Sequence, residues 1–168
     1  MRFLSALLVL FTSTQVAGQT YCSAGPTSTQ DSNLGAVTLN GDSKNINDPS
    51  NCPGVVGTQD KTAMHADLVP GNTYSLGWDV TTCGGPYNRR SVAWIDYNGN
   101  TVFDPDEQIG QVQSTGNVAT EHKTVSFTVP ADTTLKSTRM RVSCIGKNDV
   151  KLLDSLLLAV VNFFCFHL

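Results

Sequence analysis

Short runs of alternating apolar and polar residues make up most of this chain, and turn signals separate them. In the clearest run, residues 73–80, the side chains of Tyr74, Leu76, Trp78 and Val80 fall on one face. Alternation with a period of two is typical of a β-strand with one buried and one solvated face. The sequence predicts such strands at residues 36–39, 61–68, 73–80, 91–96, 107–112, 124–129 and 138–145.

About seven short strands, with almost no helical periodicity before the C-terminus, predict an all-β fold. We expect an antiparallel β-sandwich, Ig-like or jelly-roll-like, in which Trp78 and Trp94 are core residues. The segments 21–33 and 42–59 are rich in Ser, Asn, Asp, Gly and Pro, so we expect them to be long loops.

Residues 1–18 are typical of a secretory signal peptide. Arg2 supplies a basic start, residues 3–11 are apolar, and Val16 and Gly18 are small residues suited to a cleavage site. The apolar run is too short to span a bilayer. The expected mature chain therefore begins near Gln19, is extracellular, and folds as one domain over residues 19–146.

The charge balance argues against a nucleic-acid partner. The whole chain has 11 Lys and Arg residues against 14 Asp and Glu residues, a formal charge of −3, and removal of the leader would also remove the charge of Arg2. Proteins that bind nucleic acids need Lys and Arg to neutralise phosphates. Because the chain is also expected to be secreted, we expect its partner to be an extracellular protein or a glycan.

The five cysteines are Cys22, Cys52, Cys83, Cys144 and Cys165. In an oxidising compartment we expect them to form disulfide bonds, and none lies in the C-x-x-C spacing of a zinc site. Four cysteines allow three connectivities. The odd count leaves one thiol free, paired with another molecule, or placed in a segment that is not native.

Side-chain oxygens recur in residues 96–107 at the spacing of a calcium loop of the D-x-[DN]-x-[DN]-G-x5-E type. The residues at positions 1, 3, 5, 9 and 12 are Asp96, Asn98, Asn100, Asp104 and Glu107, and Val102 would supply its backbone carbonyl from position 7. Calcium takes about six to eight oxygen ligands. The spacing therefore predicts a structural Ca²⁺ site.

One position departs from the calcium-loop pattern. Such loops carry Gly at position 6, where the chain turns sharply, but this sequence has Thr101. Thr tolerates a positive φ poorly, so we expect a distorted loop or a weak site. The alternative interpretation is an ordinary surface turn, because Asp, Asn, Gly and Pro also favour turns through backbone geometry.

Several segments occur in an order that is similar to a known family. They are Tyr21-Cys22, LVPGNTYSL at 68–76, CGGPY at 83–87, VAWIDYNGNTVFDPDE at 92–107 and FTVPADTTLKSTRMRV at 127–142. In this order they resemble the GEVED domain, and the resemblance covers residues 21–146. It implies a β-sandwich module that often accompanies larger extracellular proteins, including secreted proteases and adhesins.

The chain departs from this family after Gly146. The closing Gly-Glu-x-Glu-Asp strand is missing, and residues 147–168 form a largely apolar tail instead. We favour a truncated gene model. The alternatives are a lipid-anchor signal and a membrane helix, for which the run is short, and only these would bring a membrane partner. A sandwich without its last strand exposes an edge, which the tail could cover as an improvised strand or helix.

The motifs of common enzymes are missing. The sequence contains no G-x-S-x-G elbow, H-E-x-x-H zinc signature, P-loop or dinucleotide fingerprint, and His65, His122 and His167 belong to no catalytic set. We therefore expect a secreted, non-catalytic β-sandwich module, stabilised by calcium, that recognises extracellular surfaces or matrix, as in adhesion.

Two alternatives to this function remain. One is a carbohydrate-binding module in which Tyr74, Tyr87 or Tyr97 stacks on sugar rings. The other is an accessory domain of a secreted hydrolase, separated from its catalytic partner.

Overall fold

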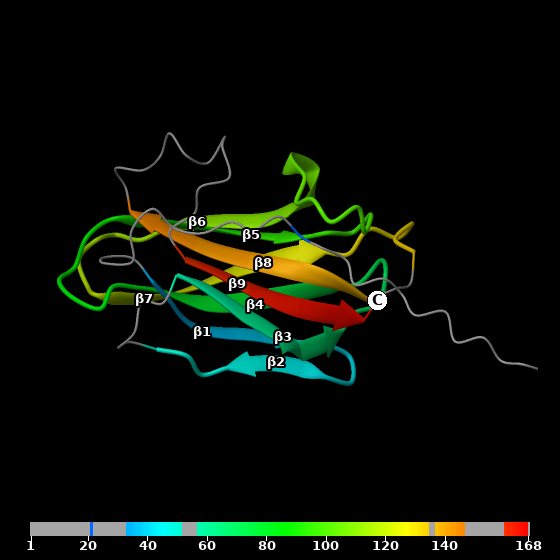
Figure 1. Cartoon of the computed structure of the whole chain (residues 1–168), viewed down its shortest axis with the longest axis horizontal. Coiled ribbons are helices and arrows are strands. Elements are labelled where there is room, and N and C mark those ends of the chain that lie inside the picture. Colours follow the sequence, from blue (N-terminus) through cyan, green and yellow to red (C-terminus); the bar gives the residue numbers. More distant parts are fainter. Residues whose placement is uncertain (1–20, 22–32, 52–56, 135–136, 147–159, 168) are drawn as a thin grey trace, which may run out of the picture.

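Two β-sheets enclose one apolar core in the computed structural model (Figure 1). The structure describes residue 21, residues 33–51, 57–134 and 137–146, and the backbone of residues 160–167. The predicted signal peptide at 1–18 lies outside these residues. Within the described chain, no helix has the length and apolar character needed to cross a membrane.

The first sheet has the strand order β2-β1-β4-β7. These strands are β1 (Asn33–Asn40), β2 (Asn45–Asp48), β4 (Thr73–Thr81) and β7 (Thr120–Thr128). Every neighbouring pair is antiparallel. The longest register joins β4 to β7, from Thr73 opposite Thr128 to Thr81 opposite Thr120.

The second sheet has the order β3-β9-β8-β5-β6. Its strands are β3 (Thr58–Asp67), β5 (Arg89–Ile95), β6 (Gln108–Gln113), β8 (Ser137–Gly146) and β9 (Val160–His167). All pairs are antiparallel except β3 and β9, which run in parallel. A parallel pair needs a long connection, and β3 and β9 lie far apart in the sequence.

The β-sandwich predicted from alternation is confirmed, and each predicted strand has a counterpart among β1 and β3 to β8. The expected loop at 42–59 contains the additional strand β2. This strand is only four residues long, NIND, and its one apolar side chain, Ile46, is buried in the core. A single apolar residue among Asn and Asp gives no detectable period.

Part of the apolar tail forms a strand within the second sheet. β9 lies between β8 and β3 (red in Figure 1), with Met140 opposite Phe164 and His65 opposite Cys165 along the backbone. It therefore covers the edge of β8 that would otherwise be unpaired. Residues 147–159 lie outside the described chain.

Trp78 is the largest fully buried side chain of the core. Its indole N–H donates to Ser91 Oγ at 2.8 Å, and this hydroxyl donates to the carbonyl of Ser143 at 2.6 Å. Because Trp78 is on β4 and Ser91 on β5, the pair links the two sheets. The prediction was wrong for Trp94, which is only partly buried and lies outside the core cluster of described residues.

A free thiol is one of the outcomes that the odd cysteine count left open, and the structure shows one in its described residues. Cys144 is a free thiol that is fully buried, because alternation along β8 points it inward with Met140 and Val142. Burial raises the pKa of this thiol to about 12, although the charge of Arg89 acts in the opposite direction. The disulfide bonds proposed for the other cysteines stay a prediction.

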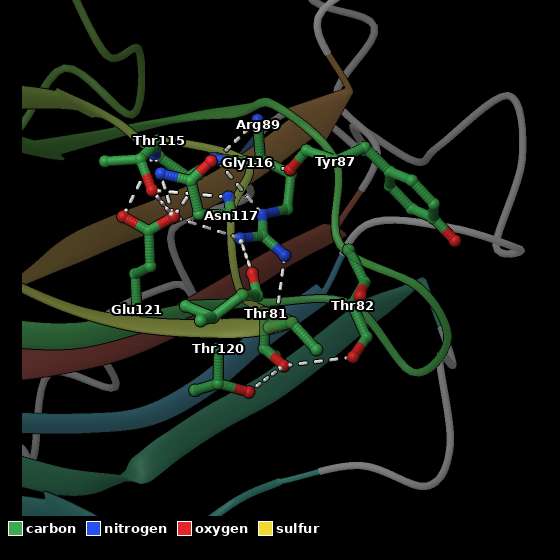
Figure 2. Close-up of polar contacts among 12 residues, drawn as sticks. Thr81, Thr82, Tyr87, Arg89, Thr115, Gly116, Asn117, Thr120 and Glu121 are labelled. Atoms are coloured by element: carbon green, nitrogen blue, oxygen red, sulfur yellow. Dashed lines mark hydrogen bonds and ion pairs between the residues drawn. The ribbon is translucent and has the colours of Figure 1, made fainter.

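A polar cluster around Arg89 holds one end of the sandwich (Figure 2). The Arg89 guanidinium is fully buried and donates to the carbonyls of Ala119 at 2.6 Å and Val118 at 3.0 Å. It also lies 3.6 Å from the Glu121 carboxylate. A buried charge is tolerated when it is paired and hydrogen-bonded, so this cluster anchors the connection between β6 and β7.

Glu121 holds the same connection from the other side. Its carboxylate accepts hydrogen bonds from the backbone N–H of Thr115 at 2.8 Å and of Gly116 at 3.2 Å. Hydrogen bonding to Lys123 first, and then these contacts with Thr115 and Gly116, lower the pKa of Glu121 to about 2. The folded state therefore favours the charged form of this residue.

The Glu121→Gln variant should be about 1–2 kcal/mol less stable at neutral pH, because it loses charged hydrogen bonds. A lowered folded-state pKa gives stability that is complete above the unfolded value near 4.5 and is lost as the pH falls toward about 2. Urea unfolding between pH 7 and pH 2 should show the difference from wild type shrinking across that window. Asp106→Asn is the control, because Asp106 is an exposed carboxylate far along the chain from the Arg89 cluster, and it should keep the wild-type stability at neutral pH.

Candidate metal centre

The loop at residues 96–107 connects β5 to β6 and ends in a 3₁₀ turn, Pro105–Glu107. Its first residue is tied to the neighbouring strand β8. The N–H of Asp96 donates to the carbonyl of Arg139 at 3.0 Å, and the Thr138 hydroxyl donates to the carbonyl of Asp96. The loop therefore begins from a fixed point at the end of the sandwich opposite the Arg89 cluster.

The Asp96 side chain is the centre of this loop and is fully buried. Its Oδ1 accepts from the N–H of Gly99 at 2.6 Å and of Asn100 at 3.2 Å. Its Oδ2 accepts from the N–H of Thr101 at 3.1 Å and from the hydroxyl of Tyr21 at 2.7 Å. Asp96 thus organises the turn from position 1 of the loop.

Asn98 and Asn100 fold the next part of the loop. The side-chain oxygen of Asn98 accepts from the N–H of Asn100 at 2.8 Å, and that of Asn100 accepts from the N–H of Val102 at 2.7 Å. Their amide nitrogens donate to Asp104 Oδ2, at 3.3 Å and 2.8 Å respectively. The structure therefore brings positions 3, 5 and 9 together.

Glu107 closes the loop from position 12. Its two oxygens accept from the N–H of Asn98 at 3.2 Å and of Asp104 at 3.1 Å, and the residue is only 4 % exposed. Burial, followed by the charges of Asp96 and Asp104, raises the pKa of Glu107 above its ordinary value, although the two N–H donors act against the shift.

The residues of the loop fit a hard cation by their chemistry, but their carboxylates are not gathered into one group. In the described part of the chain, no three Asp, Glu, His or Cys side chains are grouped closely enough to hold a metal ion. Asp96 and Glu107 are buried carboxylates with no ion pair to a described Lys, Arg or His. Asn98 and Asn100 are exposed, and their side-chain oxygens already accept hydrogen bonds from the backbone of the loop.

Thr101 adopts the conformation that its residue type disfavours. Its φ of 71° is in the left-handed region and is the only positive φ of a non-glycine residue in the described chain. Left-handed geometry costs an L-residue about 1–2 kcal/mol. The loop keeps the sharp turn at position 6, and hydrogen bonding to Asp96 Oδ2 holds Thr101 there.

Two aromatic rings and two arginines pack beside the loop. The rings of Tyr21 and Phe103 are 5.4 Å apart. Arg139 Cζ lies 4.7 Å from the centre of the Tyr21 ring, and Arg141 Cζ lies 4.3 Å from that of Phe103. Sequence analysis missed Tyr21 as part of this site, since no local pattern links it to a loop so distant along the chain.

A cleft of about 390 Å³ lies between the loop and the connection from β7 to β8. Its lining residues include Tyr97, Asp106, Glu107, Asp132 and Thr133. The hydroxyls of Tyr97 and Thr133 are buried and have no hydrogen-bond partner among the described residues. Burial, and then the Glu107 charge, raises the pKa of Tyr97 above its ordinary value.

The Thr101→Gly variant should be about 0.5–1 kcal/mol more stable, because relief of the left-handed strain exceeds the entropic cost of Gly. Chemical denaturation would measure the gain. Val102→Gly is the matched control in the same loop, and it should lower stability because Val102 has no positive φ. A loss of stability in both variants would contradict the strain assigned to Thr101.

Part of the chain matches a known protein family. The family model of the GEVED domain matches residues 90–155, a range that contains the whole 96–107 loop. No curated protein matches the chain. Two solved structures share a broadly similar form. A CARDB domain from Pyrococcus furiosus in complex with di-metal ions has 9% identity and a TM-score of 0.43, with 84% of this chain and 96% of that one covered.

The other solved structure is a Niemann-Pick type C2 protein from the Japanese carpenter ant, with 11% identity and a TM-score of 0.45. The alignment covers 86% of this chain and 99% of that one. The resemblance predicted from the ordered segments is thus confirmed over residues 90–155, which match the GEVED domain family.

Proposed function

We propose that this chain is a secreted, non-catalytic β-sandwich module whose 96–107 loop binds a structural calcium ion, and that the module recognises extracellular surfaces or matrix. The observation that carries the proposal is the burial of Asp96 and Glu107. Neither carboxylate forms an ion pair with a described cationic residue. A buried carboxylate is costly unless its charge is compensated, and a bound divalent cation would compensate both.

The remaining ligands would come from the exposed side of the loop. Asp104 and the amide oxygens of Asn98 and Asn100 would complete an oxygen set, together with the backbone carbonyl of Val102. Calcium prefers ligands of this type and tolerates flexible geometry. Its contribution would be structural, because it would hold the connection between β5 and β6 in one conformation.

Thermal unfolding in calcium and in chelator tests the site. A ligand that binds only the folded state adds RT ln(1 + [L]/Kd), about 2.7 kcal/mol at a hundredfold excess over Kd. We expect calcium to raise the Tm of the wild type. Glu107→Ala and Asp104→Asn should reduce that increase, and Asp104→Asn keeps the shape of the side chain and one oxygen that can accept the hydrogen bonds from Asn98 and Asn100.

Asp106→Ala is the matched control, because Asp106 is an exposed carboxylate of the same loop outside the predicted ligand set. It should keep the calcium response of the wild type. Equal melting curves of the wild-type protein in calcium and in chelator would exclude the proposed site.

A carbohydrate-binding function is the second candidate, and the cleft beside the loop favours it. Tyr97 and three carboxylates, those of Asp106, Glu107 and Asp132, line this cleft. Sugar recognition commonly combines an aromatic surface with hydrogen-bond acceptors, and cavities of about 300–1,000 Å³ accept small ligands. Tyr87 is 41% exposed and offers a second aromatic surface at the other end of the sandwich.

A glycan array probed with the whole chain in calcium would test this second candidate. Binding should be lost in Asp132→Ala and retained in Tyr87→Ala if the cleft is the site. The reverse pattern would move the sugar to the end that carries Tyr87. No signal on the array would exclude the carbohydrate-binding function and leave an extracellular protein as the partner. An accessory role beside a secreted hydrolase would then be the one alternative function still open.

A further inference from the structure

Tyr21 provides the one described hydrogen bond to the Asp96 side chain that comes from outside the 96–107 loop. The two residues are 75 positions apart, and the Tyr21 hydroxyl donates to Asp96 Oδ2 at 2.7 Å in a buried contact. The other donors are the N–H groups of Gly99, Asn100 and Thr101. These three belong to the turn itself.

The Tyr21 ring is held in place independently of this hydrogen bond. It packs against Phe103 at 5.4 Å, and Arg139 Cζ lies 4.7 Å from its centre. Tyr21 is 8% exposed. Since the packing fixes the ring, loss of the hydroxyl alone should leave the position of the side chain unchanged.

The hydrogen bonds of Asp96 fill its capacity as an acceptor. A carboxylate offers about four lone-pair positions, and Asp96 has two donors on each oxygen. The three loop N–H groups can leave only if the turn unfolds, whereas the O–H bond of Tyr21 can rotate away from Asp96 while the ring stays in place. Glu107, in contrast, accepts one hydrogen bond on each oxygen and keeps a position for a cation.

We propose that the Tyr21 hydroxyl and a divalent cation compete for the Asp96 carboxylate, so that Tyr21 sets the calcium affinity of the loop. This inference rests on the calcium site proposed above. Tyr21 acts as a positioning residue, because it contacts the ligand residue and not the cation. Linkage requires the effect to be reciprocal: a cation bound at Asp96 weakens the contact of Tyr21 with the loop by the same factor.

Calorimetric titration of calcium into the full chain tests the competition. The Tyr21→Phe variant removes only the hydroxyl, and we expect its Kd to fall by about tenfold, the order of one hydrogen bond to a charged group. Tyr74→Phe is the matched control, because the Tyr74 hydroxyl also donates to a carboxylate, that of Asp42, away from the loop. Its Kd should equal that of the wild type.

Thermal melting separates competition from a merely structural role of the hydroxyl. In chelator, Tyr21→Phe should melt below the wild type, because it has lost a hydrogen bond. In saturating calcium this difference should shrink or reverse. A structural role alone would keep the difference the same in both conditions and would overturn the inference.

The affinity measurement also distinguishes failure of the inference from failure of the proposed site. If the wild type binds calcium and Tyr21→Phe binds it equally or more weakly, the competition is refuted and the calcium site stands. If neither protein binds calcium and neither melting curve responds to it, the proposed site itself fails and the inference falls with it.

Discussion

The burial of two facing apolar surfaces around Trp78 is the interaction on which the rest of the structure depends. Strict alternation places the apolar side chains of β4 on one side and those of β8 on the other side of the same core. The link from Trp78 to Ser91 satisfies the indole N–H inside that core. Burial of one face fixes the register of each strand. The register in turn fixes the residue at which the strand ends and the next loop begins.

The groups that surround buried charges differ between the two ends of the sandwich. At one end, Arg89 is surrounded by carbonyl oxygens and lies near the Glu121 carboxylate, so charges of both signs are present (Figure 2). At the other end, Asp96 and Glu107 are surrounded by N–H and O–H donors. Hydrogen bonds stabilise a carboxylate but do not neutralise it, and this contrast is the physical basis for the proposal that a cation binds at the second end.

The strands and their faces were predictable because alternation is a local property. The same reasoning failed where local pattern and environment disagree. β2 carries one apolar residue and is defined by its pairing with β1. Trp94 is a large aromatic residue of the kind that usually lies in a core, but its side chain is on the opposite face of β5 from those of Ala93 and Ile95. The hydrophobicity of a residue favours its burial, but it does not specify which face of the sheet packs against the other sheet.

In the candidate metal loop, too, the local features were predictable and the contacts that depend on the folded structure were not. Its ligand spacing and the conflict at Thr101 were visible in the sequence, since residues 96–107 interact mainly with one another. The sequence could not show that the turn accepts a φ of 71° at Thr101, because hydrogen bonding to a buried Asp96 holds it there.

The sequence by itself determined the alternation that makes a sandwich and the order of oxygen-bearing residues in the loop, because both depend on neighbours in the chain. Only the tertiary structure decided that Tyr21 reaches Asp96, that Arg139 and Arg141 cover the aromatic pair, and that Cys144 remains a buried thiol. These contacts join residues far apart in the sequence. They follow from the way the two sheets stack, which no short segment encodes.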